Sequence, residues 1–321
     1  MIDDKIADVH RHLGGSIKPE FVWNIIKENP KYKYLASSQE DVERLMVCGS
    51  DRSMTSFLNK FTVLDEIVWT EQLIDDSIKH ILQGMKQENL YGALIDFSIN
   101  KYMKIGWHKK EAIRFIKQSF DRHKENLKIG LVLSIKYENP STTIKQYIDI
   151  IDEPDIVDCL AGIDFVGNEH FYDKNIIQGP LQKWHKYGKM VRAHVGEAGP
   201  VENIKSAILD LKVTNIAHGI KILQEPELIE IAIDNDIQFD LGIKGNHCTG
   251  VSDIYDHPIS DMIYNGLKVT IGTDDPVQFN TTMQNEFNIF RTIYKHRHIE
   301  DELDEMKKNA VDTIDKYVTS S

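Results

Sequence analysis

Short apolar runs alternate with longer amphipathic segments along most of the chain. The apolar runs are rich in Val, Ile, Leu and Phe and are nearly continuous in hydrophobicity, which is typical of parallel strands covered on both faces. We predict eight strands, at Ile6–His10, Ala93–Ser98, Ile129–Ile135, Cys159–Val166, Met190–His194, Asn215–His218, Ile237–Leu241 and Lys268–Thr273.

Helices are predicted between and after these strands. Val201–Leu211 illustrates the pattern, because its apolar residues repeat at the i, i+3, i+4, i+7 spacing of one helix face and Pro200 precedes it. The other predicted helices are Pro19–Glu28, Met54–Val68, Glu71–Gln87, Lys109–His123, Thr142–Ile151, Ile176–Lys186, Glu225–Asp234, Asp256–Tyr264, Met283–Tyr294 and Asp301–Val318.

Eight strands, each followed by at least one helix, predict an α/β fold of the (β/α)₈ TIM-barrel type. A doubly wound sheet alternates strands and helices in the same way, so the periodicity leaves that fold open. The stretch from Gly15 to Leu90 is too long for one crossover, and we expect extra helices there and at the C-terminus. No linker, low-complexity segment or repeat interrupts the chain, so residues 1–321 are expected to form a single domain.

Composition narrows the class of function. The 321 residues are 27% charged, and 38 Lys and Arg stand against 50 Asp and Glu, a net charge of −12. This balance argues against nucleic acid or an anionic membrane as a partner, because both need clustered basic residues. No apolar run reaches the ~18–20 residues of a bilayer span, and the N-terminus lacks the pattern of a secretory leader. The three cysteines, widely spaced, suit reduced thiols, so we expect a cytoplasmic enzyme acting on a small molecule.

Residues suited to binding a metal ion stand at the ends of several predicted strands. The first strand ends in His10-Arg11-His12, the fifth ends in His194, and the eighth is followed by Asp274. Alternate residues of a strand point to the same side, and the carboxyl ends of barrel strands meet at one mouth, so these side chains should converge. Three neutral imidazoles and one carboxylate suit Zn²⁺. We therefore predict a zinc site.

A single ion is expected at this site. A two-metal barrel hydrolase needs a bridging group from the fourth strand, typically a modified lysine, and no lysine occurs between Asp155 and Tyr172. The spacing H-x-H alone is a weak signal, since the chain has a second one at His296-Arg297-His298. No strand precedes that second pair, and we interpret it as a solvated surface cluster.

Four motifs, in this order along the chain, resemble those of the adenosine deaminase family, which belongs to the larger amidohydrolase group of metal-dependent barrels. They are H-x-H-L-x-G at His10–Gly15, H-x-G-E at His194–Glu197, H-G at His218–Gly219 and T-D-D-P at Thr273–Pro276. Two further stretches are similar to family patterns, F-L-x-x-F at Phe57–Phe61 and G-x-(D/E)-x-x-G-x-E at Gly162–Glu169. The resemblance covers the chain from His10 to Phe279.

The resemblance implies hydrolytic deamination of adenosine, 2′-deoxyadenosine or a close adenine derivative, giving an inosine-type product and ammonia through zinc-activated hydroxide. The resemblance also implies that four residues bind the metal: His10, His12, His194 and Asp274. Glu197 would shuttle protons beside the purine N1, His218 would hold and orient the hydroxide, and Asp275 would contact the purine N7.

The residues expected to bind the substrate match the family pattern at some positions and differ from it at others. The resemblance implies that the Gly167 amide contacts the N3 edge, and we expect His12 and Gly14 to line the same pocket with Asp275. Adenosine-acting members usually carry, at the position of Gly14, an Asp that binds the ribose. They also show C-P-x-S-N where this chain has G-I-K-G-N, which brings Lys244 to the mouth. These departures leave open adenine, an adenine nucleotide or an N6-modified adenine compound as the substrate.

General chemistry supports the same roles. A metal ion lowers the pKa of bound water from 15.7 to about 7, and a carboxyl group in a dry pocket has its pKa raised toward the value that an acid beside N1 needs. A cationic His218 near the hydroxide would help to hold it. Two other classes remain open: a barrel that binds without catalysis, which should have lost a ligand or the proton shuttle, and a related hydrolase of esters or amides.

Overall fold

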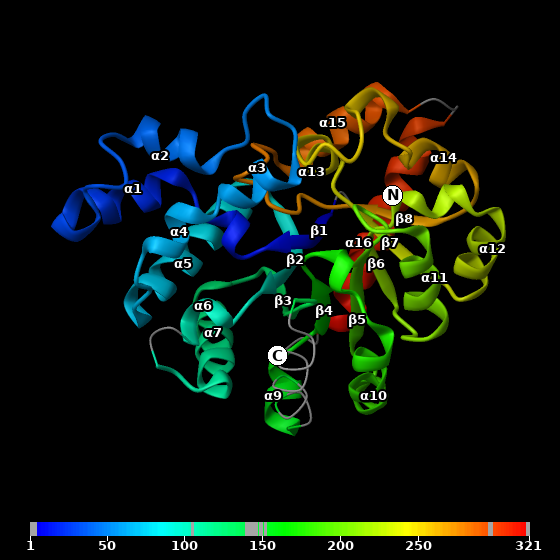
Figure 1. Ribbon diagram of the computed structural model, residues 1–321, viewed down its shortest axis with the longest axis horizontal. Helices are drawn as coiled ribbons and strands as arrows, with labels where there is room; N and C mark the ends of the chain where they lie inside the picture. The colour runs from blue at the N-terminus through cyan, green and yellow to red at the C-terminus, as the bar shows by residue number, and fades with distance from the viewer. Residues whose placement is uncertain are drawn as a thin grey trace.

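Eight parallel strands pair in chain order into one sheet that closes on itself in the computed structural model, which describes residues 5–103, 106–138, 147, 150, 153–294 and 298–318. The strands are β1 (Ile6–His12), β2 (Leu90–Phe97), β3 (Lys128–Lys136), β4 (Gly162–Val166), β5 (Met190–Val195), β6 (Asn215–His218), β7 (Gln238–Leu241) and β8 (Lys268–Ile271). The first and last strands meet where the His12 N–H donates to the Asp274 carbonyl at 2.8 Å and the Asp274 N–H donates to the His10 carbonyl at 2.7 Å. The TIM-barrel prediction is confirmed and the doubly wound alternative is wrong (Figure 1).

All eight predicted strands exist in the structure, and the predictions differ from it only in where the strands begin and end. The strand predicted from Cys159 begins at Gly162, because Pro154 starts a short helix that continues through Cys159. The first strand continues two residues beyond its predicted end, to His12. That extension places His10 and His12 on the same strand at the mouth of the barrel.

Helices surround the strands. The structure describes α1 (Pro19–Glu28), α2 (Gln39–Met46), α3 (Met54–Asn59), α4 (Thr62–Glu66), α5 (Glu71–Gln87), α6 (Asn100–Met103), α7 (Lys109–His123), α9 (Pro154–Cys159), α10 (Lys174–Trp184), α11 (Val201–Leu209), α12 (Pro226–Asp234), α13 (Ile243–Cys248), α14 (Ile259–Tyr264), α15 (Met283–Ile293) and α16 (Ile299–Tyr317). The predicted helix Met54–Val68 is two helices, α3 and α4, and α2, α6, α9 and α13 were not predicted. Most of the predicted helix Thr142–Ile151 lies outside the described residues.

The two ends of the barrel are covered differently. The extra helices α1 to α5 lie between β1 and β2, as expected, and α1 and α2 form the blue lobe at the upper left of Figure 1. The C-terminal helix α16 packs against β1, β2, β3 and β8, and its Ile314 joins a buried cluster with Val9, Leu94 and Met190. Helix α16 therefore seals the end of the barrel where the strands begin, and leaves the opposite end for polar residues.

No helix in the described part of the chain combines the length and the apolar character that crossing a membrane requires.

A buried guanidinium lies inside the barrel. Arg192 on β5 is fully buried and pairs with three buried carboxylates: its Nε donates to Asp164 Oδ2 at 2.6 Å, one terminal nitrogen lies 3.3 Å from Asp240 Oδ2, and the other donates to Asp96. Burial alone would lower the pKa of Arg192, but the facing carboxylates raise it well above its usual value. The charged cluster links β2, β4, β5 and β7.

We expect Arg192→Met to destabilise the protein by about 3–5 kcal/mol, because three buried carboxylates lose their counter-charge while an unbranched apolar side chain still fills part of the space. Denaturant unfolding measures this free energy. The matched control is Arg114→Met, which removes an exposed pair with Asp155 and should change stability little. Equal stability of the two variants would contradict the structural role of the cluster.

Candidate active site

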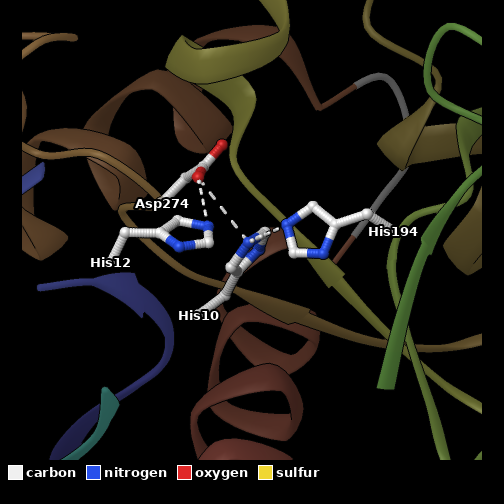
Figure 2. A group of neighbouring side chains, drawn as sticks. All are labelled: His10, His12, His194 and Asp274. Atoms are coloured by element: carbon white, nitrogen blue, oxygen red, sulfur yellow. Dashed lines mark hydrogen bonds and ion pairs between the residues drawn. The ribbon is translucent and has the colours of Figure 1, made fainter. Parts of the chain in front are cut away.

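Four potential metal ligands meet at the mouth of the barrel, as the sequence predicts. His10 and His12 come from β1, His194 from β5 and Asp274 from the turn after β8, and one ligand atom of each lies within 4.8 Å of all the others. His10 Nε2 is 3.1 Å from His194 Nε2, and Asp274 Oδ1 is 3.6 Å from His10 Nε2 and 3.3 Å from His12 Nε2. Figure 2 shows the four side chains pointing toward one another.

The geometry fits a zinc ion. Ligand atoms 2.0–2.2 Å from a tetrahedral zinc lie about 3.3–3.6 Å apart. Three of the six pairs are separated by 3.1–3.6 Å, and all six pairs lie within 4.8 Å. Two imidazoles are also held from behind, since His10 Nδ1 lies 3.2 Å from the Asp240 carbonyl and His194 Nδ1 lies 3.1 Å from Asp164 Oδ1. Such partners fix which ring nitrogen is free to bind a metal.

The electrostatics of the four residues also favour a cation. Burial lowers the pKa of His10 well below its usual value, so that ring is neutral. Burial alone would raise the pKa of Asp274, but the imidazoles of His10 and His12 hold it well below its usual range. Burial likewise opposes protonation of His12, yet Asp275 and Asp274 raise its pKa to about 10. Positive charge is therefore stabilised among these atoms, and a divalent ion can supply it by displacing a proton.

Glu197 stands on a loop that one buried carboxylate organises. Glu169 accepts hydrogen bonds from four consecutive backbone N–H groups: Oε2 accepts from Gly196 at 2.7 Å, and Oε1 accepts from Glu197, Ala198 and Gly199 at 3.0, 2.9 and 2.9 Å. Glu169 belongs to a motif that the sequence identified without giving this residue a role. Its carboxylate fixes the loop and thereby the position of Glu197.

Glu197 and His218 face each other beside the metal ligands. His218 Nε2 is 3.6 Å from Glu197 Oε2 and 3.9 Å from Asp274 Oδ2. Burial and the charge of Asp274 raise the pKa of Glu197 to about 8, which favours the acid form at neutral pH. Burial lowers the pKa of His218, so its imidazole is neutral and not the cation expected from the sequence.

Two residues of the site adopt a backbone conformation that side chains disfavour. His218 ends β6 with φ of 63°, and Asp274 follows β8 with φ of 59°. Left-handed backbone at residues other than glycine costs of the order of 1–2 kcal/mol. Here it directs one imidazole and one carboxylate into the mouth of the barrel.

The substrate-binding residues predicted from the sequence are distributed around the same mouth. Asp275 Oδ1 is buried and has no hydrogen-bond partner among the described residues, and a Cβ on Gly15 would lie 1.9 Å from it, so only glycine fits there. Burial raises the pKa of Asp275 well above its usual value. Gly14 lies beside Phe61, whose Cε1 would be 3.7 Å from an added Cβ.

Gly167 and Lys244 lie at the ends of β4 and β7. Gly167 is exposed with φ of 100°, and its Cα lies against Glu138, since an added Cβ would be 2.4 Å from Glu138 Oε2. Lys244 is partly buried in α13, where its N–H donates to Glu286 Oε2 at 3.2 Å. Among the described residues, neither of these two forms a hydrogen bond or ion pair with the four potential metal ligands, so their substrate contacts stay predictions.

Sequence reasoning missed the residues that support the ligands, although a signal existed. Asp96, Asp164 and Asp240 are acids inside otherwise apolar strands, where burial of a charge requires a partner. The second H-x-H also behaves as expected in its described member, since His298 is exposed and lies 3.4 Å from Asp301. His296 and Arg297 lie outside the described residues.

Comparison with known proteins finds one family and a shared fold. The family model described as adenosine deaminase matches residues 6–314. The chain is 27% identical over 315 residues to an adenosine deaminase of Clostridium kluyveri, covering 96% of this chain and 88% of that one. It is also 27% identical over 316 residues to an adenine deaminase of Pseudomonas putida, covering 95% and 96%. The crystal structure of an amidohydrolase from Burkhoderia ambifaria with bound zinc has a TM-score of 0.81 at 17% identity, covering 96% of this chain and 85% of that one.

We expect Asp274→Asn to lose zinc, because the amide removes the only carboxylate among the four potential ligands. The matched control is Asp275→Asn, which changes the neighbouring acid and should retain about one ion per chain. Mass spectrometry of the metal content measures both, and zinc should raise the melting temperature of the control but not of Asp274→Asn. Equal zinc content in the two variants would contradict this ligand set.

Proposed function

The chain belongs to the adenosine deaminase family, and we propose that it removes the 6-amino group of an adenine compound by hydrolysis, releasing ammonia. It is thus a metal-dependent hydrolase acting on C–N bonds of cyclic amidines. The observation that carries the proposal is the meeting of His10, His12, His194 and Asp274 beside an acid, Glu197, whose pKa is raised. We propose one zinc ion held by those four residues.

A zinc ion at this site, when bound, supplies hydroxide at neutral pH by lowering the pKa of water to about 7. The remaining chemistry belongs to side chains. Attack on C6 breaks the aromaticity of the ring and places negative charge on N1, so a proton is needed there. Glu197 in its acid form can donate that proton. Its carboxylate can then take the proton of the attacking oxygen and pass it to the 6-amino group, which leaves as ammonia when the C6–N bond breaks and C6=O forms.

The other polar groups would hold the ring and the nucleophile. Burial raises the pKa of Asp275 well above its usual value, which favours the acid form, and in that form its carboxyl group can donate a hydrogen bond to N7, which is an acceptor. A neutral His218 can donate from Nε2 toward the attacking oxygen, on the side of Glu197 Oε2 and Asp274 Oδ2. The Gly167 amide, on the left-handed turn after β4, is proposed as the donor to N3.

Adenosine or deoxyadenosine is the leading substrate, and one observation favours a second candidate, free adenine. Gly14 replaces the family's ribose-binding Asp, and the space beside it is bounded by the ring of Phe61. This apolar wall offers no hydrogen bond to a sugar. The Pseudomonas putida relative is an adenine deaminase, which agrees with this candidate. A phosphorylated adenine compound is a third alternative, because the positive charge of Lys244 could bind its phosphate.

The experiment that tests the function is a deamination assay on the zinc-loaded protein. The compounds tested are adenosine, deoxyadenosine, adenine, adenosine monophosphate and N6-methyl forms. The reaction is measured by the release of ammonia and by the loss of the 6-amino chromophore. Turnover of at least one compound is expected. Failure on all of them with zinc bound would favour a barrel that binds without catalysis, or a hydrolase of esters or amides.

Glu197→Gln should lower kcat by about 10²–10⁴-fold while zinc is retained, because the amide cannot donate or carry the acid proton. The matched control is Glu227→Gln, which makes the same change at an exposed position and should leave turnover unchanged. Turnover of Glu197→Gln near that of the wild type would remove Glu197 from the mechanism.

Gly14→Asp should shift the preference toward nucleosides. An added Cβ has room beside Phe61, and a charged hydrogen bond to a ribose hydroxyl is worth about 1.5–3 kcal/mol, or roughly a 10–150-fold rise in the ratio of kcat/KM for adenosine to that for adenine. Gly179→Asp adds the same charge where an added Cβ has open space and should leave the ratio unchanged. An equal ratio in both variants would place the sugar elsewhere.

A further inference from the structure

A line of buried hydrogen bonds runs from the backbone of α14 to the two side chains that face the metal ligands. The Ile259 N–H donates to His257 Nδ1 at 3.2 Å, and His257 Nε2 lies 3.1 Å from Asn246 Oδ1. Asn246 Nδ2 lies 3.0 Å from His218 Nδ1 and 3.4 Å from Glu197 Oε1. His257 and Asn246 are 2% and 0% exposed, so water does not substitute for these partners.

The direction of each bond follows from its first donor. A backbone N–H can only donate, so His257 Nδ1 must accept, and a neutral imidazole then carries its hydrogen on Nε2. Burial lowers the pKa of His257 to about 3, which keeps the ring neutral at neutral pH. The Nε2–H therefore donates to Asn246 Oδ1. This contact fixes the amide with Nδ2 toward His218 and Glu197.

The two hydrogens of Asn246 Nδ2 then meet two acceptors. Because His218 Nδ1 accepts one of them, the neutral ring of His218 must carry its own hydrogen on Nε2, the atom 3.6 Å from Glu197 Oε2 and 3.9 Å from Asp274 Oδ2. Glu197 Oε1 accepts the other at 3.4 Å and also lies 3.4 Å from Thr249 Oγ1. Since the carbonyl-type oxygen of a carboxyl group is the stronger acceptor, these contacts favour the acid hydrogen of Glu197 on Oε2. The hydrogen on His218 Nε2 and the hydrogen on Glu197 Oε2 therefore lie close together, since these two atoms are 3.6 Å apart.

We propose that His257 and Asn246 are positioning residues that set the tautomer of His218 and the oxygen on which Glu197 carries its proton. Neither residue touches the metal ligands in any contact that the described residues show. Their effect on deamination rests on the proposed function, whereas the placement of the two hydrogens does not. A merely structural role, capping the turn before α14, would leave the tautomer of His218 unchanged when the amide is altered.

The first test is nitrogen-15 NMR of the zinc-loaded protein with labelled histidine. The wild type should show His218 protonated on Nε2 and bare on Nδ1, the signals being assigned by their loss in His218→Gln. Asn246→Asp replaces the donor by an acceptor, so the hydrogen should move to Nδ1. Protonation of Nδ1 in the wild type, or the same tautomer in Asn246→Asp, would overturn the proposal.

The second test is kinetic and uses the substrate found active. His257→Met should lower kcat by about 10²–10⁴-fold, with KM and zinc content nearly unchanged, because the wrong tautomer removes a donor at the reacting atoms. His257→Gln can accept from Ile259 and donate to Asn246, so it should restore most of the rate. His247→Met, on α13, is the matched control and should keep full activity. Equal rates for His257→Met and His257→Gln would overturn the proposal.

The two tests separate two failures. A wild type that deaminates no compound overturns the proposed function, while its NMR spectrum still decides where the hydrogens lie. If His257→Met does not fold, as a thermal melt would show, the wild-type spectrum and Asn246→Asp decide the proposal.

Discussion

The guanidinium of Arg192 lies between the carboxylates of three other strands, and the orientation of two of the potential metal ligands, His10 and His194, depends on this arrangement. Asp164, which Arg192 holds through Oδ2, uses its other oxygen to hold His194. Arg192 also donates to the Val9 carbonyl at 2.6 Å, immediately before His10 in β1. A buried charge is costly unless it is fully paired. The same pairs that offset this cost align the ligands.

The side chains at the mouth of the barrel come from separate segments of the chain. The ligands come from three places, β1, β5 and the turn after β8, while the loop after β5 presents Glu197 under the control of Glu169. Helices α13 and α14 contribute no ligand but hold His218 from behind. Each of these groups is therefore held by a partner from a different segment of the chain.

Much of the fold could be predicted from the sequence because strand and helix periods are local. Each of the eight apolar runs became a strand, and the alternation His10, His12 correctly placed two ligands on one face. The break between α3 and α4 and the short helix α13 were missed, since their apolar spacing does not distinguish them from a longer helix or a loop. The lowered pKa of His218 was missed because it depends on the burial of this side chain in the fold. Its contact with Asn246 was missed because the two residues are 28 positions apart in the chain. Spacing along the chain does not show which polar groups share an interior.

The left-handed backbone at His218 and Asp274 limits how far the thermal stability of this protein can be increased by substitution. Glycine relaxes such a conformation at no steric cost, so a redesign guided by folding free energy alone would choose glycine at both positions. Each choice would delete a side chain of the candidate active site. Durability and activity are therefore in conflict at these two residues, and gains in thermal tolerance must be sought elsewhere in the barrel.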